Sequence, residues 1–304
     1  MTAPATRRLA LVLLLAFTVL PAARAQTQAP PAFDSTRAYH HVREQVALGP
    51  RPAASAANEK LRQYLIKTLG EAGYTATEQP FEASTPVGRV KMANVVATLA
   101  GDRPERILLA SHFDTKPINE FRFVGANDGG SSTGALLELA RVLKVRPKPR
   151  FTLEFVFFDG EEAYGEWREP NHTYGSRQYV TAARAAGTLG AIRALVLLDM
   201  IGDRSLNLKR DTNSTPWLTD ILWSTARRLG HAAHFLDEPF PVEDDHLPFV
   251  KAGIPSVDLI DLDYPDWHTA GDTLDKVSAG SLQVVGDVVL AALPEIETRL
   301  LKSK

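Results

Sequence analysis

The chain of 304 residues contains no cysteine. Disulfide bonds and a lipid-modified N-terminal cysteine are therefore excluded, so the folded state must be stabilised by its core. A chain of this length can bury a core of sufficient size. The absence of thiolates also means that any zinc site must be built from imidazole and carboxylate ligands.

The chain also lacks a strong excess of either charge and a long hydrophobic run. Its 34 basic and 36 acidic residues give a formal net charge of -2, which offers no argument for binding nucleic acid or an anionic membrane surface. The apolar run Leu9–Leu20 spans 12 residues. A membrane-spanning helix needs ~20. We therefore expect no nucleic-acid partner and no membrane span in the mature protein.

The N-terminal segment has the features of a secretory signal. Two arginines precede the apolar run, and residues 23–25 (Ala-Arg-Ala) have the small-x-small pattern of a cleavage site. We predict a signal peptide over residues 1–25, which together with the lack of disulfides indicates a bacterial periplasmic or secreted protein. Cleavage would leave Gln26 at the mature N-terminus, at the start of a Pro-rich, flexible lead-in over residues 26–33.

After the lead-in, short apolar runs alternate with segments of helical periodicity. Continuous apolar runs are typical of parallel strands covered on both faces, and the alternation places helices between them. We predict one α/β domain over residues 34–304, with a mixed, mostly parallel central sheet and helices on both faces. The predicted strands are Tyr74–Phe81, Val90–Leu99, Ile107–Ser111, Phe151–Phe158, Ala194–Met200 and Ile254–Leu262. The predicted helices are Asp34–Leu48, Ala53–Leu69, Gly134–Val145, Tyr174–Ala186, Trp217–Leu229 and Ser281–Leu301.

Acidic and imidazole side chains lie at or just past the carboxyl ends of the apolar runs in these strands, or open a helix after a glycine-rich loop. They are His112, Asp128, Glu161, Glu162, Asp199 and His268. In open α/β sheets function collects at the carboxyl ends of the strands, so we expect these side chains to lie close together. Each of them alone would more often be a cap or a turn residue. Their combination offers the ligands of a catalytic zinc site without thiolates.

The adjacent pair Glu161 and Glu162 directly follows a buried run. Two like charges side by side cost free energy unless something uses them. A bound cation would relieve the repulsion, because one glutamate can ligate the metal while its neighbour serves as general base. The alternative is a solvated pair in a loop, which fits less well with a position immediately after a buried strand.

Five motifs in this order resemble the zinc-dependent aminopeptidase family of two-zinc exopeptidases, which implies the fold of those enzymes. The motifs are HFD at 112–114, GANDGG at 125–130, DGEEA at 159–163, LLDMIGD at 197–203 and WHTAGDT at 267–273. The resemblance runs from about Tyr39 to Leu293.

More narrowly, the chain is similar to the animal-type glutaminyl-peptide cyclotransferase branch of that family. The features that carry this narrower resemblance are Trp167 after the DGEEA motif, YGSR at 174–177, LLDMIGD at 197–203, EDDHLPF at 243–249 and Trp267 directly before His268.

The narrower resemblance implies an enzyme that converts the N-terminal glutamine of peptides or proteins into pyroglutamate and releases ammonia. It implies a single zinc ion held by Asp128, Glu162 and His268, with His112 close to the site but not bound to the metal. Glu161 would be the general acid-base. The implied acidic network around it consists of Asp199 and Asp244. The implied pocket residues are Trp167 and Trp267, with Tyr264 as a further lining residue.

The wider family implies an alternative, a secreted aminopeptidase with two zinc ions. There His112 and Asp199 would help to hold the second ion, and Asp128 would bridge both. Two departures from the animal cyclotransferase pattern bear on this choice. The loop GANDGGSS looks more like the aminopeptidase version, and the cysteine pair of the animal enzymes is absent. A third alternative, a binding module that has lost catalysis, should show replaced ligands, and none is replaced.

Overall fold

A computed structural model describes residues 1–2 and 31–302 of the chain. Most of the predicted signal peptide, and Gln26, lie outside the described residues, so both remain predictions. From Pro31 onward the chain forms one compact unit. The sequence analysis placed Phe33 at the end of the flexible lead-in. In the structure, Phe33 is only 4% exposed and packs into the core beside Gly286. The core therefore begins one residue before the predicted start of the domain.

The domain is built on six strands, β1 (Ala76–Thr85), β2 (Gly88–Leu99), β3 (Arg103–His112), β4 (Phe151–Phe158), β5 (Ile192–Asp199) and β8 (Ser256–Ile260). They form one sheet in the order β1-β2-β4-β3-β5-β8. Strands β3, β4, β5 and β8 are parallel to one another, whereas β2 is antiparallel to both β1 and β4. The prediction of a mixed, mostly parallel sheet is confirmed.

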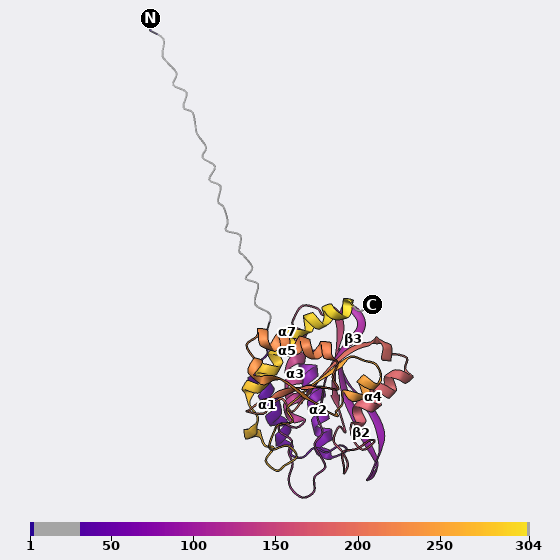
Figure 1. Ribbon diagram of the computed structural model, residues 1–304. Helices are drawn as coiled ribbons and strands as arrows, with labels where there is room; N and C mark the ends of the chain where they lie inside the picture. Colours follow the sequence, from indigo (N-terminus) through magenta and orange to yellow (C-terminus); the bar gives the residue numbers. More distant parts are fainter. Residues whose placement is uncertain (3–30, 303–304) are drawn as a thin grey trace. The chain divides into compact units, whose positions relative to one another are not determined.

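Helices cover both faces of this sheet, as predicted (Figure 1). Alternate side chains of a strand point to opposite faces, so Phe155 and Phe157 of β4 enter one core and Val156 and Phe158 the other. The larger core lies under α1 (Ser35–Ala47), α2 (Ala56–Glu71), α3 (Gly130–Lys144), α5 (Pro216–Arg228) and α7 (Ala279–Lys302). The smaller core lies under α4 (Tyr174–Ala185) and α6 (Leu247–Lys251).

Among the α-helices and strands of the described residues, three were not predicted. They are α6 and the two strands of a small parallel sheet, β6 (Leu208–Asp211) and β7 (Phe235–Phe240). Each is short, and β7 contains a proline and two acidic residues, so no apolar periodicity marks it. The small sheet matters for the site, because residues 241–244, which connect β7 to α6, line the cavity described below.

Helix α7 is the one helix in the described part of the chain that is long and apolar enough to span a membrane by length and composition. It has 24 residues, and 61% of its most apolar window is buried inside the domain. It packs against α1 and α5, so its apolar character is explained by its place in the core.

Candidate active site

The parallel strands bring the predicted site residues to one edge of the sheet. His112 and Asp199 are the last residues of β3 and β5, and Glu161 and Glu162 follow β4. Of these four residues, Asp199, Glu161 and Glu162 line a cavity of about 300 Å³. The acidic and basic side chains that line this cavity are Lys116, Asp128, Glu161, Glu162, Asp199, Glu243, Asp244 and His268. The apolar lining includes Trp167, Met200, Val242, Ile260, Leu262 and Trp267.

Asp128, Glu162 and His268 form what we call the front group. His268 Nε2 lies 3.2 Å from Asp128 Oδ2 and 3.3 Å from Glu162 Oε1. Asp128 Oδ2 and Glu162 Oε2 are buried and accept no hydrogen bond from the described residues. Buried oxygens in this state are costly unless a cation or a solvent molecule satisfies them. One imidazole and two carboxylates with convergent ligand atoms fit a zinc ion with an open position.

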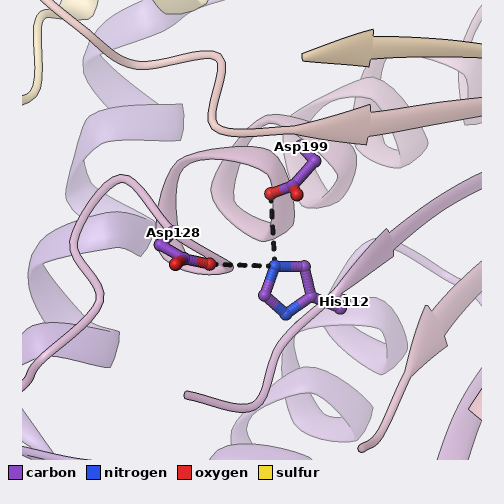
Figure 2. A group of neighbouring side chains, drawn as sticks. All are labelled: His112, Asp128 and Asp199. Atoms are coloured by element: carbon purple, nitrogen blue, oxygen red, sulfur yellow. Dashed lines mark hydrogen bonds and ion pairs between the residues drawn. The ribbon is translucent and has the colours of Figure 1, made fainter. Parts of the chain in front are cut away.

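His112 completes a second group of convergent ligands. Its Nε2 atom lies 3.2 Å from Asp128 Oδ1 and 3.2 Å from Asp199 Oδ1 (Figure 2). Burial alone lowers the pKa of His112, but the carboxylates of Asp199 and Glu161 outweigh it and raise the pKa well above 6.5. Asp128 thus belongs to both groups, and the place between His112 and Asp199 can hold either a proton or a second cation.

Glu161 lies beside this centre. Its Oε2 atom is 3.8 Å from His112 Nδ1, and the side chain is 6% exposed. Burial raises the pKa of Glu161 well above its ordinary value, and the charges of Asp244 and Glu162 raise it further, against the opposing effect of His112. Burial and the charge of Asp199 raise the pKa of Asp244 to about 6. A carboxyl group with a raised pKa in a cavity has the properties of a proton carrier.

Two further carboxylates hold the backbone of the site. Asp114 accepts hydrogen bonds from the backbone N–H groups of Glu161 (3.1 Å) and Glu162 (3.3 Å). Asp272 accepts from the backbone N–H groups of Asn127 (2.8 Å) and Asp128 (3.1 Å). Asp114 Oδ1 also lies 3.7 Å from His112 Nδ1.

Tyr264 supports the site from behind. Its hydroxyl donates to Asp272 at 2.8 Å, its side chain is 3% exposed, and it does not line the cavity. The Asp272 carboxylate thus supports the loop that carries Asp128. No sequence signal distinguishes a cap from such a support.

Local backbone geometry is unusual beside the ligands. Gly129 has φ +72°, and a Cβ atom there would lie 2.8 Å from the carbonyl oxygen of Asp114 and 2.9 Å from His112 Cε1. Only glycine allows the chain to turn from Asp128 into α3 this closely. His268 has φ +52°, a left-handed conformation that is uncommon for a residue other than glycine and that recurs at functional sites.

Two tryptophans stand at the mouth of the cavity. Trp167 is 36% exposed and Trp267 is 44% exposed. The Trp267 ring lies 4.5 Å from the His268 ring, and the Trp167 ring is stacked on that of His172 at 4.1 Å with an interplanar angle of 14°. His172 is buried, and burial lowers its pKa to about 4, so this ring is a neutral platform at pH 7.

A second cluster of acids around an imidazole, the rear group, consists of Asp211, Asp244, His246 and Asp258. His246 Nε2 lies 3.0 Å from Asp211 Oδ2, and its Nδ1 atom lies 3.8 Å from Asp258 Oδ2. Although burial raises the pKa of Asp211, the hydrogen bond from His246 lowers it below its ordinary value. All four are buried, and of these four only Asp244 lines the cavity.

Comparison with known proteins places this site in a family. Residues 94–293 match peptidase family M28, and the chain belongs to this family. Family membership implies a zinc-dependent enzyme, and the two groups of ligands fit that ion. The resemblance to the glutaminyl-peptide cyclotransferases noted in the sequence is confirmed by the relatives.

One curated relative is the glutaminyl-peptide cyclotransferase-like protein of Mus musculus, 35% identical over 255 residues. The match covers 73% of this chain and 66% of the mouse protein, so the chain spans about two thirds of that relative's length. The crystal structure of an Acidobacteriales bacterium glutaminyl cyclase is 39% identical, with a TM-score of 0.86, and the match covers 91% of this chain and 99% of that one. A leucine aminopeptidase precursor from Bacteroides thetaiotaomicron is 28% identical, with a TM-score of 0.80, over 87% of this chain and 98% of its own.

Proposed function

We propose that the enzyme is a glutaminyl-peptide cyclotransferase, which converts the N-terminal glutamine of peptides or proteins into pyroglutamate and releases ammonia. The observation that carries this proposal is the composition of the cavity. A buried proton carrier, Glu161, and a group of zinc ligands lie at its floor, and two indole rings stand at its mouth. Relatives named as glutaminyl cyclases share the chain's fold along almost their whole length.

Asp128, Glu162 and His268 would hold one zinc ion. When bound, the ion supplies Lewis-acid polarisation of the glutamine side-chain carbonyl. The front group suits this task because its carboxylates are buried and its open side faces the cavity.

The reaction itself joins two groups of the same substrate residue. The free α-amine attacks the side-chain amide carbon, a carbon–nitrogen bond forms, and a five-membered lactam closes. Glu161 takes a proton from the attacking nitrogen and delivers it to the amide nitrogen, which leaves as ammonia. Atoms and protons balance without a water nucleophile, and the main contribution of the cavity is to hold the amine and the amide together.

The other cavity residues tune this proton transfer. The charge of Asp244 keeps the proton affinity of Glu161 high, and Asp199 does the same for Asp244. Trp167 and Trp267 exclude water from the mouth and pack on the short glutamine side chain. A bound dication would lower these pKa values and so oppose the effect of the neighbouring carboxylates.

We propose one zinc ion rather than two because a proton on His112 can take the place of a second ion between His112 and Asp199. His112 is held between Asp128 and Asp199, and its raised pKa favours an imidazolium that donates to those carboxylates. A positive charge is then present without a second ion, and His112 stays off the metal.

The shared position of Asp128 favours the second candidate function, a two-zinc aminopeptidase. It would ligate both ions, and the solved leucine aminopeptidase precursor has a similar fold. Here Glu161 would take the proton from an attacking water.

Two synthetic peptides separate these functions, one that begins with Gln and one that begins with Leu. After incubation with zinc-loaded enzyme, loss of ammonia from the Gln peptide with the Leu peptide intact is the result expected. Release of free Leu, together with two zinc ions per chain by elemental analysis, would establish the aminopeptidase instead. A Glu161→Gln variant serves as the control, because both reactions need this proton carrier.

We further propose that the enzyme acts outside the cytoplasm, as a periplasmic or secreted protein. The support is the signal-like pattern of residues 1–25 and the absence of cysteine. Fractionation of cells that express the full chain tests this proposal, and recovery of uncleaved protein in the cytoplasm would contradict it.

A further inference from the structure

One carboxylate of the cavity has no part in the proposed reaction. Glu243 lies in the loop between β7 and α6, is exposed, and lines the cavity. The structure gives it no hydrogen bond or ion pair with any residue of the described chain. Its immediate neighbour Asp244, by contrast, is buried and accepts a hydrogen bond from Asp245.

The cavity as a whole carries an excess of negative charge. Six carboxylate side chains line it, against a single lysine, Lys116. Lys116 Nζ lies 3.6 Å from Glu162 Oε2, so its charge is directed at the floor and not at the mouth. Even the two charges of one zinc ion leave the lining negative. The chain carries a net charge of only -2, so this field belongs to the cavity and not to the whole surface.

The geometry of the cavity decides which part of a substrate meets Glu243. Asp128, Glu161 and Glu162 are at most 4% exposed and form the floor, whereas the mouth is formed by exposed side chains. A peptide whose first residue occupies the floor must leave through the mouth. Its second residue then passes the rim where Glu243 stands.

We propose that Glu243 makes the enzyme prefer glutaminyl peptides with a basic second residue and disfavour those with an acidic one. This inference rests on the proposed function and adds a substrate class to it. A lysine or arginine at the second position of the peptide would have an unpaired carboxylate within reach. A glutamate at that position would be repelled by the like charge of Glu243. Because Glu243 is exposed, solvent and salt screen the effect, so we expect a ratio of about fivefold between the two kinds of peptide at low salt.

The test uses three otherwise identical peptides that begin Gln-Lys, Gln-Ala and Gln-Glu. Their kcat/KM values are measured by ammonia release, at low and at high salt. The variants are Glu243→Gln and Glu243→Lys. The matched control is Glu238→Gln, which removes the same charge from an exposed carboxylate of β7 that pairs with Lys209 and does not line the cavity.

For the wild type and the Glu238→Gln control, kcat/KM should be highest for the Gln-Lys peptide, intermediate for Gln-Ala and lowest for Gln-Glu. The differences among these values should become smaller at high salt. Glu243→Gln should reduce the ratio of the Lys to the Glu peptide by about threefold, and Glu243→Lys should invert the order. Equal conversion of all three peptides by the wild type, or an unchanged ratio in both Glu243 variants, would overturn the inference. Failure to convert even the Gln-Ala peptide would instead overturn the proposed function.

Discussion

The front group and the rear group place similar side chains at the same end of the sheet, yet their surroundings differ. In the front group the His268 side chain is 20% exposed and faces the cavity, whereas the His246 side chain of the rear group is fully enclosed. Charge in the front group can be balanced from outside by a metal ion. Charge in the rear group must be balanced within the protein, by the pairing of His246 with Asp211 and by protons.

The difference shows that the solvent exposure of each group determines what its carboxylates can do. A buried carboxylate next to a cavity can bind an ion or move a proton, because one side of it remains accessible. The same carboxylate in a sealed place has to be hydrogen-bonded or protonated. Asp244 belongs to both surroundings, since it lines the cavity and contacts Asp258, so the rear group positions a residue of the cavity wall.

Removal of the metal should have the largest effect, because only the front group is proposed to bind the ion. A chelator should abolish cyclisation, because the front group loses its Lewis acid, and should leave the domain folded, because the large core does not depend on the ion. Activity assays and circular dichroism before and after zinc is restored measure both effects. Loss of the helical signal on chelation would show that the ion is also structural.

Replacement of the proton carrier Glu161 should have the next largest effect on activity. Glu161→Gln preserves the shape of the side chain and removes its ability to accept a proton, so kcat should fall by about a hundredfold or more. The zinc content of this variant should stay at the wild-type level, because Glu161 is not a ligand in the proposed site. A parallel loss of zinc would place Glu161 among the ligands and contradict this assignment.

The rear group can be tested through Asp258. Burial, and then the charges of Asp244, Asp211 and Asp199, raise the pKa of Asp258 well above its ordinary value, which favours a protonated carboxyl group beside Asp244. Asp258→Asn keeps a donor and should retain kcat within about threefold. Asp258→Leu leaves the Asp244 carboxyl without this partner, and should lower kcat and destabilise the fold by about 1–3 kcal/mol.

The pH dependence of stability gives the matching control. Because the folded-state pKa of Asp258 is raised above its unfolded-state value, its contribution to the free energy of unfolding is greatest at acidic pH and is lost as the pH rises through the folded-state pKa. Urea unfolding should therefore favour Asp258→Asn over the wild type increasingly as the pH is raised. If the Asn variant lost as much activity as the Leu variant, the carboxyl group would have to be ionised.

A smaller effect is expected at the mouth of the cavity, where His172 supports Trp167. His172→Ala removes the stacked platform, and the loss of a contact worth about 0.5–1.5 kcal/mol should raise KM by about two- to tenfold with little change in kcat. His172→Phe should restore KM, because it restores a stacked ring. A fall in kcat that the Phe variant does not reverse would indicate a role for the imidazole itself.

The smallest expected effect involves neither the front group nor the rear group. If cleavage follows Ala25, the mature enzyme begins with Gln26 and offers its own N-terminus as a substrate. Intact-mass measurement of the exported protein should then show the loss of one ammonia, and the Glu161→Gln variant should lack this loss. An unmodified Gln26 in active enzyme would contradict the prediction.

Much of the architecture could be read from local patterns. The apolar run Phe151–Phe158 became β4 with the predicted bounds, and Tyr174–Ala186 became α4 within one residue. Because apolar periodicity is a property of neighbouring residues, it also placed His112 and Asp199 at the ends of strands. The short strands β6 and β7 escaped notice because they carry no such periodicity.

The kinds of element, the absence of thiolate ligands and the places where acids follow strands can all be derived from the amino-acid sequence. These depend on residues that are close together along the chain. Only the tertiary structure decided that Asp272 holds the Asp128 loop, that His172 supports Trp167, and that Asp258 lies sealed behind Asp244. Asp272 acts on a loop that lies 144 residues earlier in the chain. Asp258 meets Asp244, and Trp167 meets His172, only through the fold of the chain between them. The role of each therefore follows from packing and burial, and not from local pattern.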